Sequence, residues 1–192
     1  MTILILGLVI FLGMHSIRIF ADDSRTALRA RFGVLGWKAG YSIISLVGFV
    51  LIVVGYGMAR QQPVVLWVPP IPMRHIAALL TAIAFVLLAA TYVPSNRIKA
   101  SLRHPMLLAV KVWALAHLLA NGNLADVILF GSFLVWAILC FRASRQRDRA
   151  QATQYAAGTM GGTLATLAIG LVAWAAFAMS LHQRLIGVSP FG

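Results

Sequence analysis

Acidic and sulfur-bearing side chains are scarce in this sequence. It contains no glutamate, four aspartates and one cysteine, Cys140, beside five histidines. A single cysteine excludes a disulfide within the chain, and so sparse a set of ligands argues against a dense metal cluster. Charged residues make up 10% of the chain. Soluble domains carry about 25%, so the sequence is not that of an ordinary soluble protein.

Apolar residues are abundant. They make up 61% of the chain, and the mean hydropathy is +0.90, which indicates an integral membrane protein. We expect residues 1–192 to form one transmembrane domain, with no separate soluble catalytic domain among them. The net charge of +12 comes from connections beside apolar segments, where basic residues set topology and contact anionic lipid. We therefore expect no nucleic-acid partner.

The apolar segments predict an all-α, polytopic helix bundle with about six transmembrane helices, because about 20 apolar residues cross a bilayer. The predicted spans are 2–20, 37–59, 74–93, 105–121, 124–141 and 159–182. The fourth and fifth are the shortest, and Asn121-Gly122-Asn123 joins them in a tight hairpin. Glycine adopts a positive φ at little cost, so we expect one at Gly122.

Lysine and arginine are distributed unequally between the connections. They flank the first, third and fifth connections, whereas the other side of the membrane has Arg60, Arg74 and Arg184. The positive-inside rule then predicts that the first group is cytoplasmic and that both termini lie outside. The connection QQPVVLWVPPIP, which contains Trp67, is expected on the outer side. The first group comprises Arg18, Arg25, Arg29, Arg31, Lys38, Arg97, Lys99, Arg103, Arg142, Arg145, Arg147 and Arg149.

The fourth predicted span contains unusual polar residues. A charged lysine at a helix centre costs roughly 2.5–3.5 kcal/mol on insertion scales, so such residues mark a candidate functional site. Trp113, His117 and Asn121 share one helix face, whereas His104 and Lys111 lie on another. A neutral His117 can ligate a metal or haem iron, or it can hydrogen-bond a neighbouring helix.

His15 is a second histidine within an apolar span, one turn before Arg18. Two intramembrane histidines on different helices favour a ligand pair over two isolated structural residues.

The sequence resembles the NnrU family of bacterial membrane proteins over essentially its whole length. The resemblance rests on GMHSIR at residues 13–18 and on LRHPMLLAVKVWALAHLLANGNLADVILFGSFL at residues 102–134. NnrU proteins are named from denitrification gene clusters and are associated with nitric oxide or nitrite metabolism. The resemblance therefore implies a multi-pass protein of the bacterial inner membrane, with a redox activity linked to denitrification.

The same domain resembles the zeta-carotene isomerases of plants and cyanobacteria, which hold haem b and isomerise a cis double bond. That resemblance implies haem b as cofactor, a hydrophobic substrate or membrane lipid as partner, and His15 and His117 as axial ligands of the iron. The isomerases carry a cysteine three residues before the second histidine, but Ala114 stands here, which argues against their ligand switch. The expected haem-binding residues are His15, His117, Trp113, Asn121, Arg103, His104 and Lys111.

The predicted boundaries place His15 and His117 at different depths. The mismatch is roughly 10 Å at 1.5 Å per residue. Depth alone would pair His117 with His75 or His182, both near the outer face, and would put His104 nearer to His15. The resemblance favours His15 and His117, with His75 as the first substitute ligand. His182, at the tail of the last predicted span beside Arg184, is expected to meet water or headgroups and not to bind haem.

Two other functions remain open. Arg103-His104-Pro105 is reminiscent of membrane methyltransferases of the isoprenylcysteine carboxyl type, in which such a motif helps to hold S-adenosylmethionine. Alternatively, Arg103 anchors the topology and Pro105 begins a helix. The absence of glutamate argues against the methyltransferase. The third function is a non-enzymatic scaffold or assembly factor for a respiratory complex.

A small residue recurs at every fourth position of the sixth span. This stripe, Gly158, Gly162, Thr166 and Gly170, predicts close packing of that helix within the bundle, or alternatively an oligomer interface. Asp126 either meets Lys111 across the hairpin or caps the fifth span, and the cap is the simpler interpretation.

Overall fold

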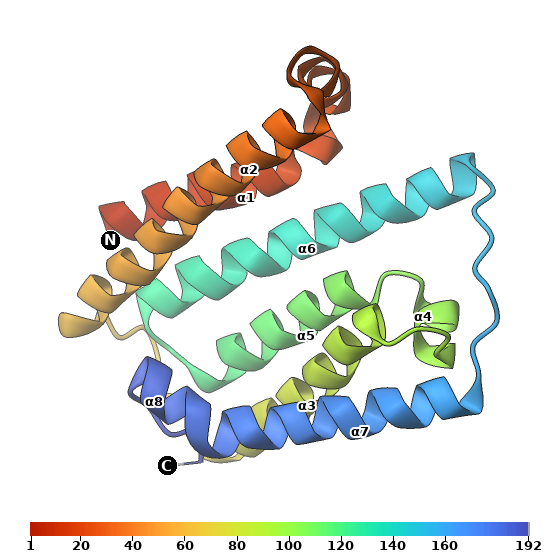
Figure 1. Cartoon of the computed structure of the whole chain (residues 1–192). Helices are drawn as coiled ribbons and strands as arrows, with labels where there is room; N and C mark the ends of the chain where they lie inside the picture. Colours follow the sequence, from red (N-terminus) through yellow and green to blue (C-terminus); the bar gives the residue numbers. More distant parts are fainter. Residues whose placement is uncertain (192) are drawn as a thin grey trace.

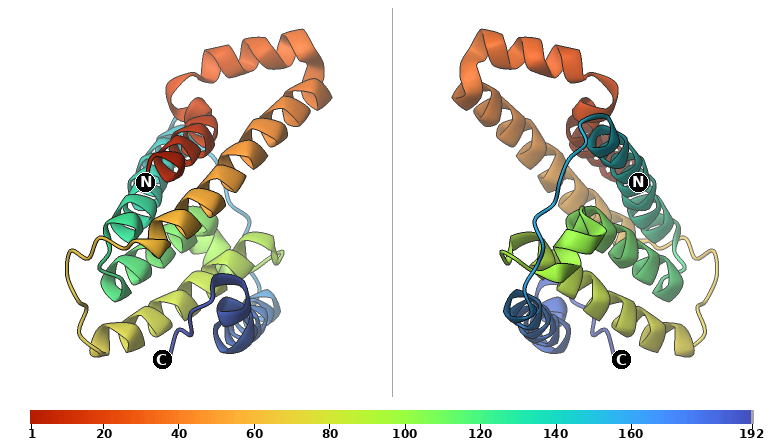
Figure 2. Two further views of the ribbon diagram at one scale, coloured as in Figure 1. Left: turned by 90° about the vertical axis from the view of Figure 1, so that its left-hand side faces the viewer. Right: turned by 90° about the vertical axis from the view of Figure 1, so that its right-hand side faces the viewer.

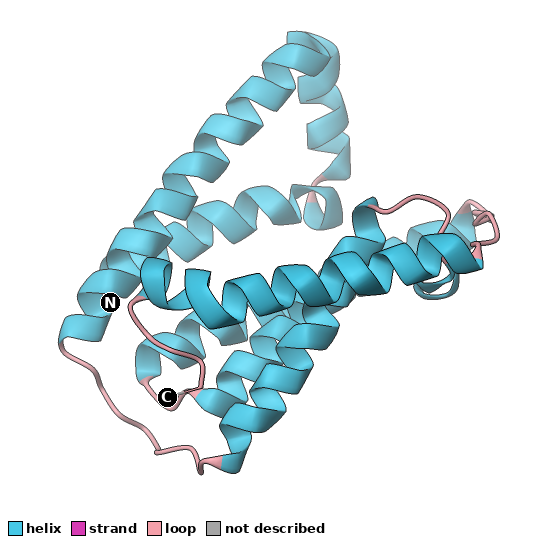
Figure 3. Ribbon diagram, turned by 60° about the horizontal axis from the view of Figure 1, so that its bottom comes forward, coloured by secondary structure: helices cyan, strands magenta, loops and turns pink. Residues whose placement is uncertain are grey.

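The computed structural model describes residues 1–191, and over these residues it contains helices and loops but no strand (Figure 3). Five of its helices are long and apolar enough to cross a membrane, and a sixth apolar helix is shorter. The prediction of an all-α membrane bundle is confirmed. In chain order the elements are α1 (Thr2–Phe20), α2 (Asp22–Gln61), α3 (Pro72–Tyr92), α4 (Arg97–Leu102), α5 (Pro105–Ala120), α6 (Leu124–Ala150), α7 (Met160–Ala176), the π-helix η1 (Phe177–Leu181) and α8 (His182–Ile186).

Helix α6 lies at the centre of the bundle (Figure 1). It packs against α1 on one side and α5 on the other. Side chains of α6 link the two in one buried cluster, which includes Leu8 of α1, Phe130 of α6 and Ala114 of α5. Helix α2 packs on α1, while α3 packs on α5 and α7. The bundle therefore has an α1–α2 side and an α3–α5–α7 side, separated by α6.

Several helices extend beyond the predicted spans. Helix α2 begins at Asp22 and bends at Gly33, which has φ 70° and ψ 172°. Helix α6 continues past residue 141 to Ala150, and α4 was not predicted. A hydropathy pattern detects only apolar stretches, whereas arginine and alanine also favour helix where the chain leaves the membrane.

The small-residue stripe packs within the chain, as the first of the two interpretations predicted. Thr166 is fully buried. A Cβ atom on Gly170 would lie 2.6 Å from the Cα of Val86 in α3. The absence of a side chain therefore lets α7 approach the backbone of α3 closely.

The tight hairpin between α5 and α6 is present, but the expected positive φ at Gly122 is wrong. In residues 1–191 the glycines with positive φ are Gly33 and Gly187. The carbonyl of Gly122 accepts hydrogen bonds from the amides of Leu66 and Trp67, at 2.8 and 3.2 Å. A Cβ atom on Gly122 would collide with the Trp67 carbonyl. Gly122 thus provides room for the 62–71 loop.

Asp126 caps α6, as predicted. It forms a capping box with Asn123, and the Tyr56 hydroxyl also donates a hydrogen bond to its carboxylate. The buried carboxylate therefore ties α2 to the start of α6.

Candidate functional site

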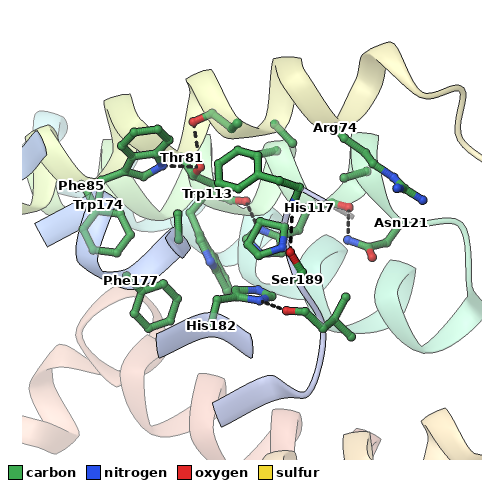
Figure 4. A pocket seen from close by; sticks show the side chains of 18 of the residues that line it. Arg74, Thr81, Phe85, Trp113, His117, Asn121, Trp174, Phe177, His182 and Ser189 are labelled. Carbon is green, nitrogen blue, oxygen red and sulfur yellow. Dashed lines mark hydrogen bonds between the residues drawn. The ribbon is translucent and has the colours of Figure 1, made fainter. Parts of the chain in front are cut away.

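A cavity of about 610 Å³ lies on the α3–α5–α7 side of the bundle and is closed by η1, α8 and residues 187–191 (Figure 4). Its wall is mostly apolar and aromatic, and no aspartate or glutamate lines it. Its larger and polar side chains are Arg74, Thr81, Phe85, Trp113, His117, Asn121, Trp174, Phe177, His182, Ser189 and Phe191.

Two imidazoles from distant parts of the sequence line this cavity. Nδ1 of His117 lies 2.8 Å from the carbonyl oxygen of Trp113, one turn earlier in α5. Nδ1 of His182 lies 2.7 Å from the carbonyl oxygen of Val188. A carbonyl only accepts, so each Nδ1 carries the proton, and Nε2 of the neutral ring keeps its lone pair. This tautomer is the one that binds a metal through Nε2.

Neighbouring side chains hold these groups in place. The His117 ring stacks on Phe130, with 4.5 Å between centroids, and the Asn121 amide donates to the His117 carbonyl at 2.9 Å. On the opposite wall, the indole N–H of Trp174 donates to Thr81 at 3.1 Å. Side chains of α3, α5, α6 and α7 therefore fix the shape of the cavity.

Arg74 gives the cavity a positive charge. It lies in the first turn of α3, and in residues 1–191 no carboxylate is within ion-pair distance of it. A cation without an acidic partner at an apolar cavity suits a ligand that carries an anionic group.

The last segment of the chain folds back over the cavity. Gly187, with φ 77°, ends α8, and the Arg60 guanidinium donates to the Ile186 carbonyl at 2.8 Å. This return places the half-buried His182 in the cavity wall, with its Nδ1 on the Val188 carbonyl. Depth in the membrane had already made His182 a possible partner of His117, but the sequence did not show that residues 187–191 fold back over it.

His15 lies elsewhere. Its Nδ1 also donates to a carbonyl, that of Phe11, at 2.7 Å, and its ring packs near Tyr41 and Trp136. It does not line the cavity. The helices that carry His15 and His117 each pack on α6, and of these two histidines it is His117 that lines the cavity. His75 is exposed and is not in the cavity wall either.

A second polar cluster joins the start of α5 to the end of α6. His104 Nε2–H donates to the Asp148 carboxylate at 2.8 Å, and the Tyr155 hydroxyl donates to the same carboxylate at 3.1 and 3.2 Å. Burial and this hydrogen bond raise the pKa of Tyr155. The Arg103 guanidinium lies 5.6 Å from the centre of the Tyr155 ring. His104 and Arg103 therefore make structural contacts in this cluster.

Lys111 lies between the two sites. Its ammonium nitrogen is 3.8 Å from the centre of the Phe141 ring, and His104 meets the same ring edge-on at 6.1 Å. Of the predicted haem-binding residues, the structure thus gathers Trp113, His117 and Asn121 in the cavity and leaves the others outside it. Within residues 1–191 no three His, Cys, Asp or Glu side chains form a metal-binding group.

Comparison with protein families identifies the chain. The family model described as NnrU protein matches residues 3–190. The chain belongs to the NnrU family. Neither the comparison with curated proteins nor that with solved structures finds a match.

The NnrU match runs from α1 into the segment that closes the cavity. All residues that line the cavity except Phe191, including His117 and His182, therefore lie inside the matched region. The same is true of His15.

Proposed function

We propose that this NnrU protein binds haem b in the cavity, with His117 and His182 as axial ligands of the iron. The observation that carries the proposal is the pair of imidazoles that line one cavity, each with its Nδ1 proton donated to a backbone carbonyl. Two histidines are too few for a protein-only zinc site, but they suit a porphyrin iron, whose other four ligands come from the macrocycle.

The rest of the cavity fits the same group. A volume of about 610 Å³ is within the usual range for cofactor pockets. Its aromatic wall suits a porphyrin face, and Arg74 supplies a cation for the propionates. Haem b, when bound, supplies a one-electron couple.

The resemblance to the isomerases favours a different pair, His15 and His117. In this chain α6 stands between the helices that carry them, so we assign the second ligand to His182. The proposed role is redox, and the departure at Ala114 makes isomerisation the weaker alternative.

We further propose that the protein lies in the bacterial inner membrane with its basic connections in the cytoplasm. The long basic end of α6 and the 94–104 segment lie at the same end of the bundle (Figure 1), as the positive-inside rule requires.

Haem content of the detergent-purified protein tests the proposal. The parent protein, expressed with haem available, should retain haem after purification, measured by the pyridine haemochrome assay. Ala178→Phe partly fills the cavity and replaces neither histidine, and it should lower haem content roughly tenfold or more. Ala173→Phe in α7, at an exposed position outside the cavity, is the matched control and should retain haem. Equal haem content in both variants would place the haem elsewhere.

A further inference from the structure

The start of α2, residues 22–32, runs in a different direction from the bundle. It follows α1 after Ala21 and ends at the Gly33 bend. Figure 2 shows it as the red-orange helix that crosses the top of the molecule, at a steep angle to both α1 and the rest of α2.

The connections at both ends of this segment fix where it lies. Helix α1 and the apolar part of α2 are both candidate membrane spans. A connection between two consecutive spans begins and ends at the same membrane surface. A helix that lies across the spans at that point therefore lies along this surface.

The segment has the side-chain pattern of a helix in the plane of a membrane. Leu28 and Phe32 are one turn apart on one face and are 36% and 58% exposed. Arg25 and Arg29 flank this apolar stripe on one side and Arg31 on the other, while Asp23 lies on the opposite face. Arginines that flank an apolar stripe reach headgroups while the stripe enters the acyl boundary.

The charges favour an anionic surface. Asp22 pairs with Arg25 at 2.7 Å, but within residues 1–191 Arg29 and Arg31 pair with no carboxylate. Arg31 instead lies over the Phe32 ring at 5.3 Å. Each basic residue near an anionic membrane surface contributes about 1 kcal/mol of attraction.

We infer that residues 22–32 form an interfacial helix that binds anionic phospholipid headgroups, with Leu28 and Phe32 inserted at the acyl boundary. Gly33 makes this arrangement possible, since its φ of 70° with ψ of 172° is a conformation essentially restricted to glycine. The helix anchors the α1–α2 pair to the surface of the membrane independently of any haem.

Hydrogen exchange of the full-length protein in lipid nanodiscs tests this inference. Backbone amides of residues 22–32 should exchange about tenfold more slowly in phosphatidylglycerol nanodiscs than in phosphatidylcholine nanodiscs. The reason is that the anionic surface attracts the arginines and stabilises the membrane-bound helix. Arg29→Gln with Arg31→Gln should remove that difference and leave exchange of the spans unchanged.

Asp23→Asn on the opposite face is the matched control, and it should keep the lipid dependence. Leu28→Asn with Phe32→Asn is a second variant, and it should speed exchange in both lipids by removing the acyl contact. If parent and double-arginine variant exchange equally in the two lipids, the segment does not bind anionic headgroups. Slow exchange that is the same in both lipids would instead indicate a zwitterionic surface contact and would also overturn the inference.

Discussion

Nε2 of His104 and Oδ2 of Asp148 lie 2.8 Å apart and connect the residue that precedes α5 to the last turns of α6. Asp148 is only 8% exposed, and Tyr155 donates to the same carboxylate. The contact therefore fastens the 151–159 connection to the bundle at its basic end.

The first prediction concerns this pair. Asp148→Asn and His104→Ala should each destabilise the protein by about 1.5–3 kcal/mol, the usual range for a hydrogen bond to a charged group. Thermal unfolding in detergent measures the effect. The double variant should lose less unfolding free energy than the sum of the losses in the two single variants. Strictly additive losses would show that the two residues do not interact.

The second prediction concerns the hairpin turn. Gly122→Ala should lower the melting temperature and the yield, because its Cβ would collide with the Trp67 carbonyl and displace the 62–71 loop. Gly131→Ala in α6 is the control, since a Cβ there meets nothing within 4 Å. It should be neutral or stabilising by up to about 1 kcal/mol. Equal melting temperatures for both variants would contradict the close approach.

The fold was largely predictable because membrane spans are read from apolar runs, and the six predicted spans coincide with helices. The hairpin was predictable from Asn121-Gly122-Asn123. The steric reason why position 122 requires a glycine was not. Its neighbour Trp67 is far away in the sequence. A requirement of that kind depends on tertiary structure alone.

The candidate site was predictable only in part. The i, i+4 spacing placed Trp113, His117 and Asn121 on one face, and that face lines the cavity. Depth in the membrane made His182 a possible partner of His117, but His182 was expected to meet water or headgroups, because nothing in the sequence shows that residues 187–191 return over it. Asp148 was missed because it lies in a polar extension of α6 beyond the predicted span.

The third prediction concerns Lys111. Lys111→Leu should leave membrane insertion unchanged but destabilise the protein by about 0.5–2 kcal/mol, the range for a partly desolvated cation over an aromatic ring. The same change in a Phe141→Leu background should cost much less, because the ring that faces the ammonium is gone. If the cost is the same in both backgrounds, the cation–ring contact does not stabilise the helix pair.

The fourth prediction concerns topology. In a Cys140→Ser background, Trp67→Cys should react with a membrane-impermeant maleimide applied from outside, since Trp67 is 44% exposed in the 62–71 loop. Arg147→Cys, at the basic end of α6, should react only after the membrane is permeabilised. The opposite labelling pattern would reverse the proposed orientation.

The reduced-minus-oxidised absorbance spectrum of the haem-loaded protein tests the central claim most directly. The parent should show the sharp bands of a low-spin iron with two imidazole ligands. His117→Ala and His182→Ala should each lose those bands or most of the haem, while His15→Ala, on the far side of α6, should keep the parent spectrum. If His15→Ala loses the bands and His182→Ala keeps them, His182 is not the ligand and the account of the cavity is contradicted.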